Sequence, residues 1–121
     1  MLTQEELFAK CPYATAQKIL SGKWVLIILH SLSEGKLRFN ELQKQLPDIT
    51  QATLTKQLRS LEGYGIIIRT VYPQIPPKVE YELSDIGKDF SEVLNSLEIW
   101  GDKYINFYNK ENMSTTNYIK E

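Results

Sequence analysis

Few side chains in this sequence are suited to catalysis or metal binding. The 121 residues include one cysteine, Cys11, and one histidine, His30, whereas a structural zinc site needs about four such ligands. The chain holds no Ser/His/Asp set, paired-carboxylate cleft, glycine-rich phosphate loop or HExxH motif. We therefore expect no enzyme, metal or cofactor, and we expect His30, at the end of an apolar helix, to be structural.

Cys11 has the side chain with the most reactive potential. It precedes Pro12, which suits the first turn of a helix because that position needs no N–H group. Cys11 then stands at the N-cap, where a helix N-terminus stabilises a thiolate. Two interpretations stay open, a thiol sensor and a small residue that packs near an interface. A thiol-reactive enzyme is a third hypothesis, but no base lies beside Cys11 in the sequence.

Charged residues are distributed unevenly along the chain. The formal net charge is −1, which by itself gives no reason to expect a nucleic-acid partner. Residues 36–69, however, carry a net charge of +3 and residues 84–121 a net charge of −3. A basic middle followed by an acidic C-terminal part indicates a face that contacts nucleic acid.

The N-terminal residues lack the apolar core of a signal peptide. The longest apolar run, Trp24–Leu29, has six residues, whereas a membrane-spanning helix needs about 20. A single cysteine excludes a disulfide framework and fits a reducing compartment. We expect a soluble, cytoplasmic protein of one domain with no membrane partner.

Apolar spacing and chain breakers predict the order of elements. Trp24–Leu29 is apolar all round, which predicts a central helix buried on every side. The whole order predicts a mainly α protein with a small β-hairpin, namely a winged helix-turn-helix domain over residues 1–108 with a long C-terminal helix, followed by a polar, flexible tail over 109–121. The expected helices cover residues 13–20, 23–33, 39–46, 50–62 and 85–108, and the strands cover 66–72 and 79–83, with a turn at 73–77 and a short bridge at Leu37.

The expected helix over residues 50–62 has two different faces. Leu54, Leu58 and Leu61 recur at helical spacing and form its inner face. Such a helix can enter a DNA major groove if its outer face lets hydroxyl and amide groups reach base edges and lets cations neutralise phosphates. The alternative is an ordinary solvated face. The outer face and its flanks contain no acid and consist of Gln51, Ala52, Thr53, Thr55, Lys56, Arg59 and Ser60.

Two further places can hold DNA phosphates. Arg38 and Asn40 lie where the preceding helix begins, and backbone N–H groups and a basic side chain bind phosphate there. Asn40 has the alternative role of capping that helix. Lys78 follows the hairpin turn, where a wing would lie along the backbone or minor groove.

Glu80 and Glu82 alternate with apolar residues on the second strand. Because they are acidic, we expect only the tip of the wing to approach DNA. We expect the two carboxylates to make structural pairs, with Arg69 across the hairpin as the partner.

Several short motifs occur together in the order typical of one family. They are Cys11-Pro12, Gly22-Lys23-Trp24, Arg38-Phe39-Asn40-Glu41-Leu42, Leu58-Arg59-Ser60-Leu61-Glu62, and Tyr72-Pro73 followed by Pro76-Pro77-Lys78-Val79-Glu80-Tyr81. On these motifs the sequence resembles the HxlR-type transcriptional regulators, a bacterial branch of the winged-helix regulators related to the MarR group. The resemblance covers residues 11–100, about three quarters of the chain.

This resemblance implies a homodimer that binds a palindromic operator in double-stranded DNA through helix 50–62, Arg38 and the wing around Lys78. It implies repression or activation of transcription. In some members of the family the cysteine that matches Cys11 senses oxidants or electrophiles such as quinones and aldehydes. Dimer contacts are implied for the N-terminal and last helices, with the candidates Leu7, Phe8, Tyr13, Leu94, Leu97, Trp100, Tyr104 and Tyr108.

The last expected helix independently indicates a partner surface. Its apolar and aromatic stripe, from Phe90 to Tyr108, is wider than a small winged helix can cover, although part of it packs within the chain. In a dimer the two DNA-binding helices would meet half-sites about 34 Å apart. The competing hypothesis is a dimeric winged-helix module that binds proteins and not DNA. A small-molecule effector is compatible with the sequence, but no residue specifies one.

Overall fold

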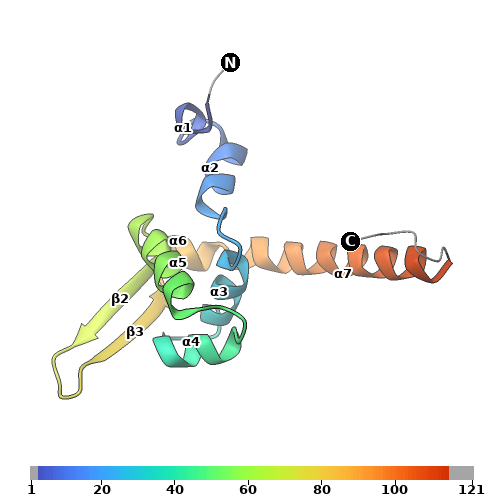
Figure 1. Ribbon diagram of the computed structural model, residues 1–121. Helices are drawn as coiled ribbons and strands as arrows, with labels where there is room; N and C mark the ends of the chain where they lie inside the picture. The colour runs from blue at the N-terminus through green and yellow to red at the C-terminus, as the bar shows by residue number, and fades with distance from the viewer. Residues whose placement is uncertain (1–2, 115–121) are drawn as a thin grey trace. The chain divides into compact units, whose positions relative to one another are not determined.

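The structure is a computed structural model that describes residues 3–114. It divides the chain into two compact units, Met1–Asp89 and Phe90–Glu121, and each is described by itself. The second unit contains the long helix α7 (Ser91–Ser114). The first unit contains, in order, α1 (Gln4–Leu7), α2 (Pro12–Ile19), α3 (Val25–Leu32), β1 (Leu37–Arg38), α4 (Phe39–Gln45), α5 (Gln51–Gly63), β2 (Ile67–Tyr72), β3 (Lys78–Leu83) and α6 (Asp85–Asp89) (Figure 1).

Helices α3, α4 and α5 and the inner face of the sheet form the core of the first unit. The inward leucines of α5, Leu54, Leu58 and Leu61, are at most 1% exposed, which confirms the predicted inner face. Burial of each such side chain stabilises the fold by about 1.5–3 kcal/mol. The remaining core side chains are Val25, Ile28, Leu29, Leu32, Leu42, Leu46, Ile49, Ile67, Tyr81 and Leu83.

Helix α3 is buried on one side only. Leu26 is 38% exposed and Ile27 is 45% exposed, so the prediction of a helix buried on every side is wrong. The reason is geometric: neighbours that pack on one side of a helix cover a single stripe of it, whatever the residues elsewhere. His30, on the same helix, is exposed.

A helix-turn-helix is formed by α4, the turn over residues 46–50, and α5. Thr50 is the N-cap of α5, and its Oγ1 accepts the backbone N–H of Thr53 at 3.1 Å. Ile49 is buried beside this cap, as expected of a hydrophobic staple. The Gln43 side chain donates to the Ile49 carbonyl at 3.2 Å, so the turn is held to both helices.

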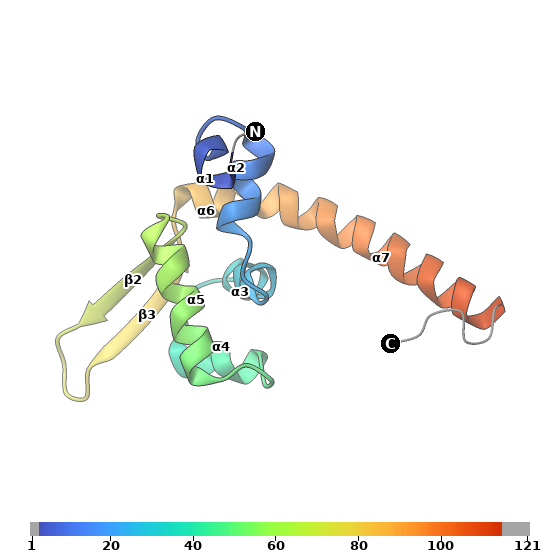
Figure 2. The same cartoon turned by 45° about the horizontal axis from the view of Figure 1, so that its top comes forward.

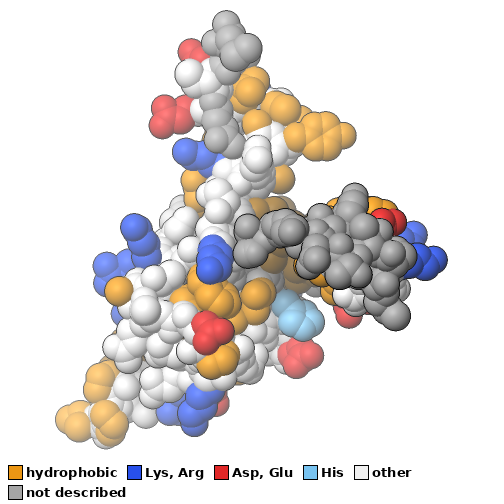
Figure 3. All heavy atoms as spheres, turned by 45° about the vertical axis from the view of Figure 1, so that its right-hand side comes forward, with side chains coloured by type: hydrophobic (Ala, Val, Ile, Leu, Met, Phe, Trp, Pro, Cys, Tyr) orange, Lys and Arg blue, Asp and Glu red, His pale blue; other side chains and the backbone are white. Residues whose placement is uncertain are grey.

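The sheet has three antiparallel strands in the order β1–β3–β2. Leu37 and Arg38 form the short strand β1, where the sequence predicts a short bridge of one or two strand residues at Leu37. The β2–β3 hairpin extends away from the helices (Figure 2). Hydrophobic side chains gather at its tip (Figure 3), where residues 73–77 are all exposed and Ile75 is fully exposed.

The chain differs from expectation at both ends. Thr3 and Glu6 form a reciprocal capping box, in which the Thr3 N–H donates to Glu6 Oε1 and the Glu6 N–H donates to Thr3 Oγ1. This capping box starts α1. The sequence did not predict α1, because four residues are too few to show an apolar period. The expected helix 85–108 is two helices, because the chain turns at Phe90. α7 then runs to Ser114, so residues 109–114 of the predicted flexible tail are helical, and the rest of that tail lies outside the described residues.

Apolar and aromatic residues follow one side of α7. The Trp100 and Tyr104 rings stack with their centroids 5.7 Å apart, and Tyr104 and Phe107 follow at 5.6 Å. These three side chains are between 47% and 63% exposed. Among the described residues, no helix combines the length and apolar character needed to cross a membrane.

Candidate nucleic-acid interface

The outer face of α5 is accessible along its length. Gln51, Ala52, Lys56, Arg59 and Ser60 are exposed, while Thr53 and Thr55 are half-buried. The Thr53 hydroxyl accepts a hydrogen bond from the Thr50 hydroxyl at 3.0 Å, so this side chain is partly engaged in the helix cap. An open hollow of about 590 Å³ runs over the face and is lined by Gln51, Ala52, Thr55, Lys56 and Arg59.

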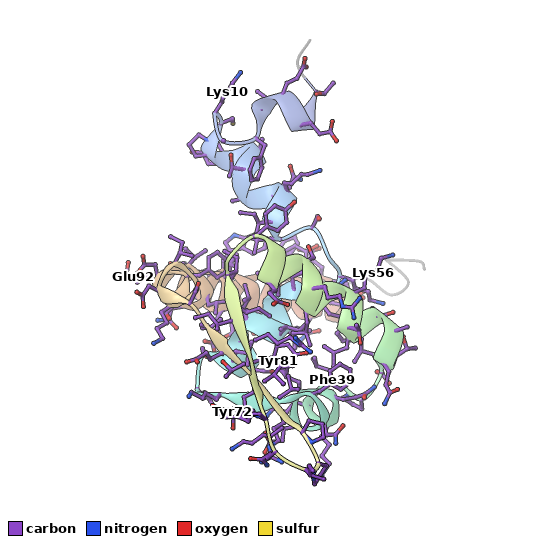
Figure 4. All side chains as sticks on the ribbon, turned by 90° about the vertical axis from the view of Figure 1, so that its left-hand side faces the viewer. Lys10, Phe39, Lys56, Tyr72, Tyr81 and Glu92 are labelled. Carbon is purple, nitrogen blue, oxygen red and sulfur yellow. The ribbon has the colours of Figure 1, made fainter. Side chains whose placement is uncertain are left out.

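Neither Lys56 nor Arg59 forms an ion pair within 4 Å in the part of the chain that the structure describes. Other cations do, since Lys36 pairs with Glu82 and Lys78 with Glu80. The guanidinium of Arg59 and the ammonium of Lys56 are thus available to a phosphate; Lys56 is labelled in Figure 4.

The N-terminus of α4 combines a basic residue with an acid. Arg38 is the N-cap, and its own backbone N–H donates to Glu41 Oε1 at 2.8 Å. Asn40 is exposed at the second helical residue and makes no capping hydrogen bond. The capping role therefore belongs to Glu41, and Asn40 and the Arg38 side chain remain free to meet a ligand.

Lys78 of β3 is held by one neighbour on its own strand and one on β2. Its Nζ lies 3.4 Å from Glu80 Oε2 and 4.9 Å from the centroid of the Tyr72 ring. Tyr72 donates its hydroxyl hydrogen to Glu80 Oε1 at 3.0 Å. This hydrogen bond, followed by the neighbouring Lys78, lowers the pKa of Glu80, and the same hydrogen bond raises the pKa of Tyr72. A phosphate that binds the Lys78 ammonium must therefore compete with the Glu80 carboxylate.

The expected pairing of Arg69 with Glu80 and Glu82 is wrong. Arg69 lies opposite Tyr81 in the β2–β3 register, whereas Thr70 lies opposite Glu80. Because successive side chains of a strand point to opposite faces of the sheet, Arg69 is on the other face from both acids. Glu82 instead meets Lys36, with 3.9 Å between Nζ and Oε2.

Cys11 is the N-cap of α2, as predicted, and its thiol is free and half-buried. The turn before α2 is tightly held. Thr15 Oγ1 accepts the Ala9 backbone N–H and donates to the Cys11 carbonyl, both at 2.8 Å. Ala9 adopts φ +67°. Of the three predicted interface residues in this region, Tyr13 is 87% exposed, whereas Leu7 and Phe8 are half-buried, with the Phe8 ring 5.9 Å from Tyr64.

Sequence reasoning missed two residues near this surface. Gln57, half-buried between the inner and outer faces of α5, accepts the Trp24 backbone N–H with its Oε1 at 3.3 Å. It also fills the space beside Gly22, where a Cβ would lie 2.5 Å from the same oxygen. The other is Arg69, whose position facing α5 depends on strand register. Helical spacing alone could have shown Gln57 between the two faces of α5, but no local signal reveals its partner.

These features define a winged helix-turn-helix protein in which α5 presents a basic, acid-free outer face. A sequence model of the HxlR-like helix-turn-helix family matches residues 19–109. The chain belongs to this family of transcriptional regulators, which is not an enzyme class.

Individual relatives agree with this assignment. The chain is 50% identical over 97 residues to the HTH-type transcriptional regulator YdeP of Bacillus subtilis, which covers 80% of this chain and 76% of that protein. The structure of the HTH-type transcriptional regulator ytcD matches with a TM-score of 0.76 at 46% identity and covers 78% of this chain and 97% of that one. The redox regulator HypR in its reduced form matches with a TM-score of 0.78 at 38% identity and covers 82% and 98%.

Proposed function

We propose that this protein binds operator DNA as a homodimer and that α5 enters the major groove. The observation that carries the proposal is the outer face of α5, where the exposed Lys56 and Arg59 have no ion-pair partner among the described residues. Two cations on one face neutralise phosphates, while Gln51, Ala52 and the hydroxyl of Thr55 are suited to base edges. A regulator of this kind acts on the chromosome, so we expect it in the cytoplasm.

Residues next to α5 extend the proposed interface. Arg38 and Asn40 are exposed at the start of α4, where a helix N-terminus adds N–H groups that favour a phosphate. Thr53 contributes its half-buried hydroxyl at the start of α5, and Lys78 lies at the wing. Such phosphate contacts set the register of the protein on the duplex, and contacts from α5 to bases set the sequence preference.

The homodimer is proposed from the exposed apolar surface. Val93, Leu97, Trp100, Tyr104 and Tyr108 on α7 are each 39% exposed or more. An aromatic surface of this kind on a soluble protein indicates a partner surface. Leu94, on the same stripe, and Leu7, Phe8 and Tyr13 of the N-terminal segment complete the proposed interface. Two copies would present two α5 helices to a palindromic operator.

Cys11 is the proposed site of a redox response. The support is its free thiol at a helix N-terminus, together with the similarity to HypR, whose structure is described in a reduced and an oxidized form. The described residues hold no second cysteine, so oxidation would give a disulfide between two copies or with a small thiol. Cys11→Ser is expected to abolish any loss of DNA binding on oxidation. An unchanged response in this variant would contradict the proposal.

Fluorescence anisotropy with a labelled duplex from the intergenic region upstream of the gene tests DNA binding. We expect binding that weakens steeply with salt and is lost in the double variant Lys56→Glu, Arg59→Glu. Lys10→Glu is the control for reversal of a single charge elsewhere, because Lys10 is exposed in the turn between α1 and α2 and is not part of the α5 face. If the wild type binds no duplex at low salt, the DNA-binding proposal fails and the exposed stripe of α7 favours a protein-binding module.

A further inference from the structure

A second hollow adjoins the α5 face on the side of the sheet. Its volume is about 200 Å³. Thr55 and Arg59 line both this hollow and the larger one over α5, so the two surfaces are continuous. The hollow is lined by Phe39, Thr55, Leu58, Arg59, Glu62, Arg69 and Tyr81.

Arg69 reaches this hollow because of the strand register. It lies opposite Tyr81 in the β2–β3 ladder, and paired residues share a face of the sheet. The Tyr81 side chain is buried against the core and lines the same hollow as Phe39, in the region between α5 and the start of α4 (Figure 4). Arg69 therefore stands on the face of the hairpin that is turned toward α5.

The charges of the hollow favour an anion. Arg59 and Arg69 are both exposed, and neither makes an ion pair within 4 Å among the described residues. Glu62 is the one acid in the lining, so two guanidinium groups face one carboxylate. The two lysines on the opposite face of the sheet differ, since Lys36 is paired with Glu82 and Lys78 with Glu80. Arg69 of β2, unlike Lys78 of β3, can therefore bind a ligand without displacing a carboxylate from an ion pair within 4 Å.

We propose that this hollow seats a backbone phosphate of the DNA whose major groove holds α5, clamped between Arg59 and Arg69. The inference rests on the DNA binding proposed above and adds a phosphate contact on β2 to the one proposed for Lys78 of β3. A guanidinium presents paired N–H donors that match phosphate oxygens. Leu58 and Phe39 complete the lining beside the two arginines.

The salt dependence of DNA binding tests the assignment. The slope of log K against log salt concentration is negative, and loss of one phosphate contact makes it less steep by about 0.9. If affinities are equal at 1 M salt, this corresponds to about fivefold weaker binding at 0.15 M salt. We expect this effect from Arg69→Gln for each protomer on the duplex, while Arg69→Lys keeps the slope near that of the wild type. Lys10→Gln removes the same charge elsewhere and is expected to leave the slope unchanged. The probe is the labelled upstream duplex, measured by anisotropy between 0.05 and about 0.3 M salt.

Glu62→Gln separates a phosphate seat from a structural pair. In the proposed seat Glu62 repels the phosphate, so its neutralisation is expected to leave DNA binding unchanged or tighter. If Arg69 and Glu62 instead act as a structural pair, Arg69→Gln and Glu62→Gln lower the melting temperature equally and neither changes the salt slope, which overturns the proposal.

Three other results also overturn the proposal. One is a wild type that binds DNA while Arg69→Gln keeps the full slope; in that case DNA binding by α5 survives and the phosphate seat does not. A second is a loss of slope in Lys78→Gln and not in Arg69→Gln. The third combines two measurements: inorganic phosphate at constant ionic strength stabilises the wild type but not Arg69→Gln, and Arg69→Gln binds DNA as the wild type does. The hollow would then bind free phosphate and not a phosphate of DNA. A wild type that binds no duplex removes this inference together with the proposed function.

Discussion

Gly87 of α6 is packed so closely that a single added methyl group should destabilise the protein. The residue is buried, and a Cβ built on it would collide with the backbone carbonyl oxygen of Ile66 and lie 3.3 Å from Leu83 Cβ. The Ile66 carbonyl cannot withdraw freely, because it accepts the backbone N–H of Ser84 at 2.9 Å. The Ser84 hydroxyl, whose single hydrogen lies nearer the Gly65 carbonyl (2.6 Å), is also 2.9 Å from the Ile66 oxygen. Gly87→Ala must therefore break the backbone hydrogen bond or displace α6.

The expected cost follows from the contacts. Overpacking of a tight site costs about 1–3 kcal/mol, and the loss of one buried hydrogen bond costs about 1 kcal/mol. Alanine regains about 1 kcal/mol over glycine inside a helix. The net destabilisation is about 1–3 kcal/mol. With an unfolding entropy of about 2.1 cal/mol/K per residue, this lowers the melting temperature by about 4–12 °C.

Thermal unfolding followed by circular dichroism measures this change. The matched control is Gly63→Ala, the same substitution at the last residue of α5, where a Cβ meets no atom within 4 Å. There the helix propensity of alanine acts alone, and we expect an increase of up to about 4 °C. A Gly87→Ala variant as stable as Gly63→Ala would refute the reasoning, because the approach of α6 to Ile66 would then not be close.

Three further predictions concern single contacts. Tyr72 lowers the pKa of Glu80, so the ionised carboxylate stabilises the fold above its ordinary pKa of 4.5 and loses that contribution as the pH falls through the lower folded-state value. Tyr72→Phe is expected to lower the urea midpoint at pH 7, and the difference from the wild type should shrink below pH 4.5 and vanish below the folded-state pKa. Gln57→Ala leaves the Trp24 N–H without its partner and should cost about 1 kcal/mol in urea unfolding; an unchanged midpoint argues against that contact. Tyr104→Glu places a charge in the aromatic stripe of α7 and should convert a dimer to folded monomers, as measured by sedimentation velocity. Asn106→Glu is the control, because residue 106 lies about 200° away around the helix and should leave the dimer intact. If both variants behave alike, the proposed interface is contradicted.

Local patterns predicted most of the elements because each carried its own signal. Leu54, Leu58 and Leu61 at helical spacing identify α5, and Thr50 marks its start. The alternation of residues 79–83 identifies the second strand of the hairpin. Helix α1 was missed because its four residues are shorter than any apolar period. The break at Phe90 was missed because the residues on either side of it are all compatible with one helix.

The outer face of α5 was predicted from the sequence for the same reason. A helix repeats every 3.6 residues, so once the leucines point inward the positions of Lys56 and Arg59 on the outside follow from spacing alone. Their exposure in the structure agrees with that geometry. Whether Lys56 and Arg59 form ion pairs could not be predicted, since the sequence does not show which acids lie within 4 Å of which bases.

The sequence by itself determined the helix-turn-helix, the hairpin, the position of Cys11 at a helix N-terminus and the acid-free face of α5, because each depends on neighbours within one or two turns of chain. Only the tertiary structure decided which cations are free. Strand register places Arg69 beside Tyr81 and away from Glu80, and it brings Lys78 to Glu80 and Lys36 to Glu82. The physical reason is that an ion pair acts over about 4 Å, and distances of that size between β1, β2, β3 and α5 are set by how these elements pack, not by their separation along the chain.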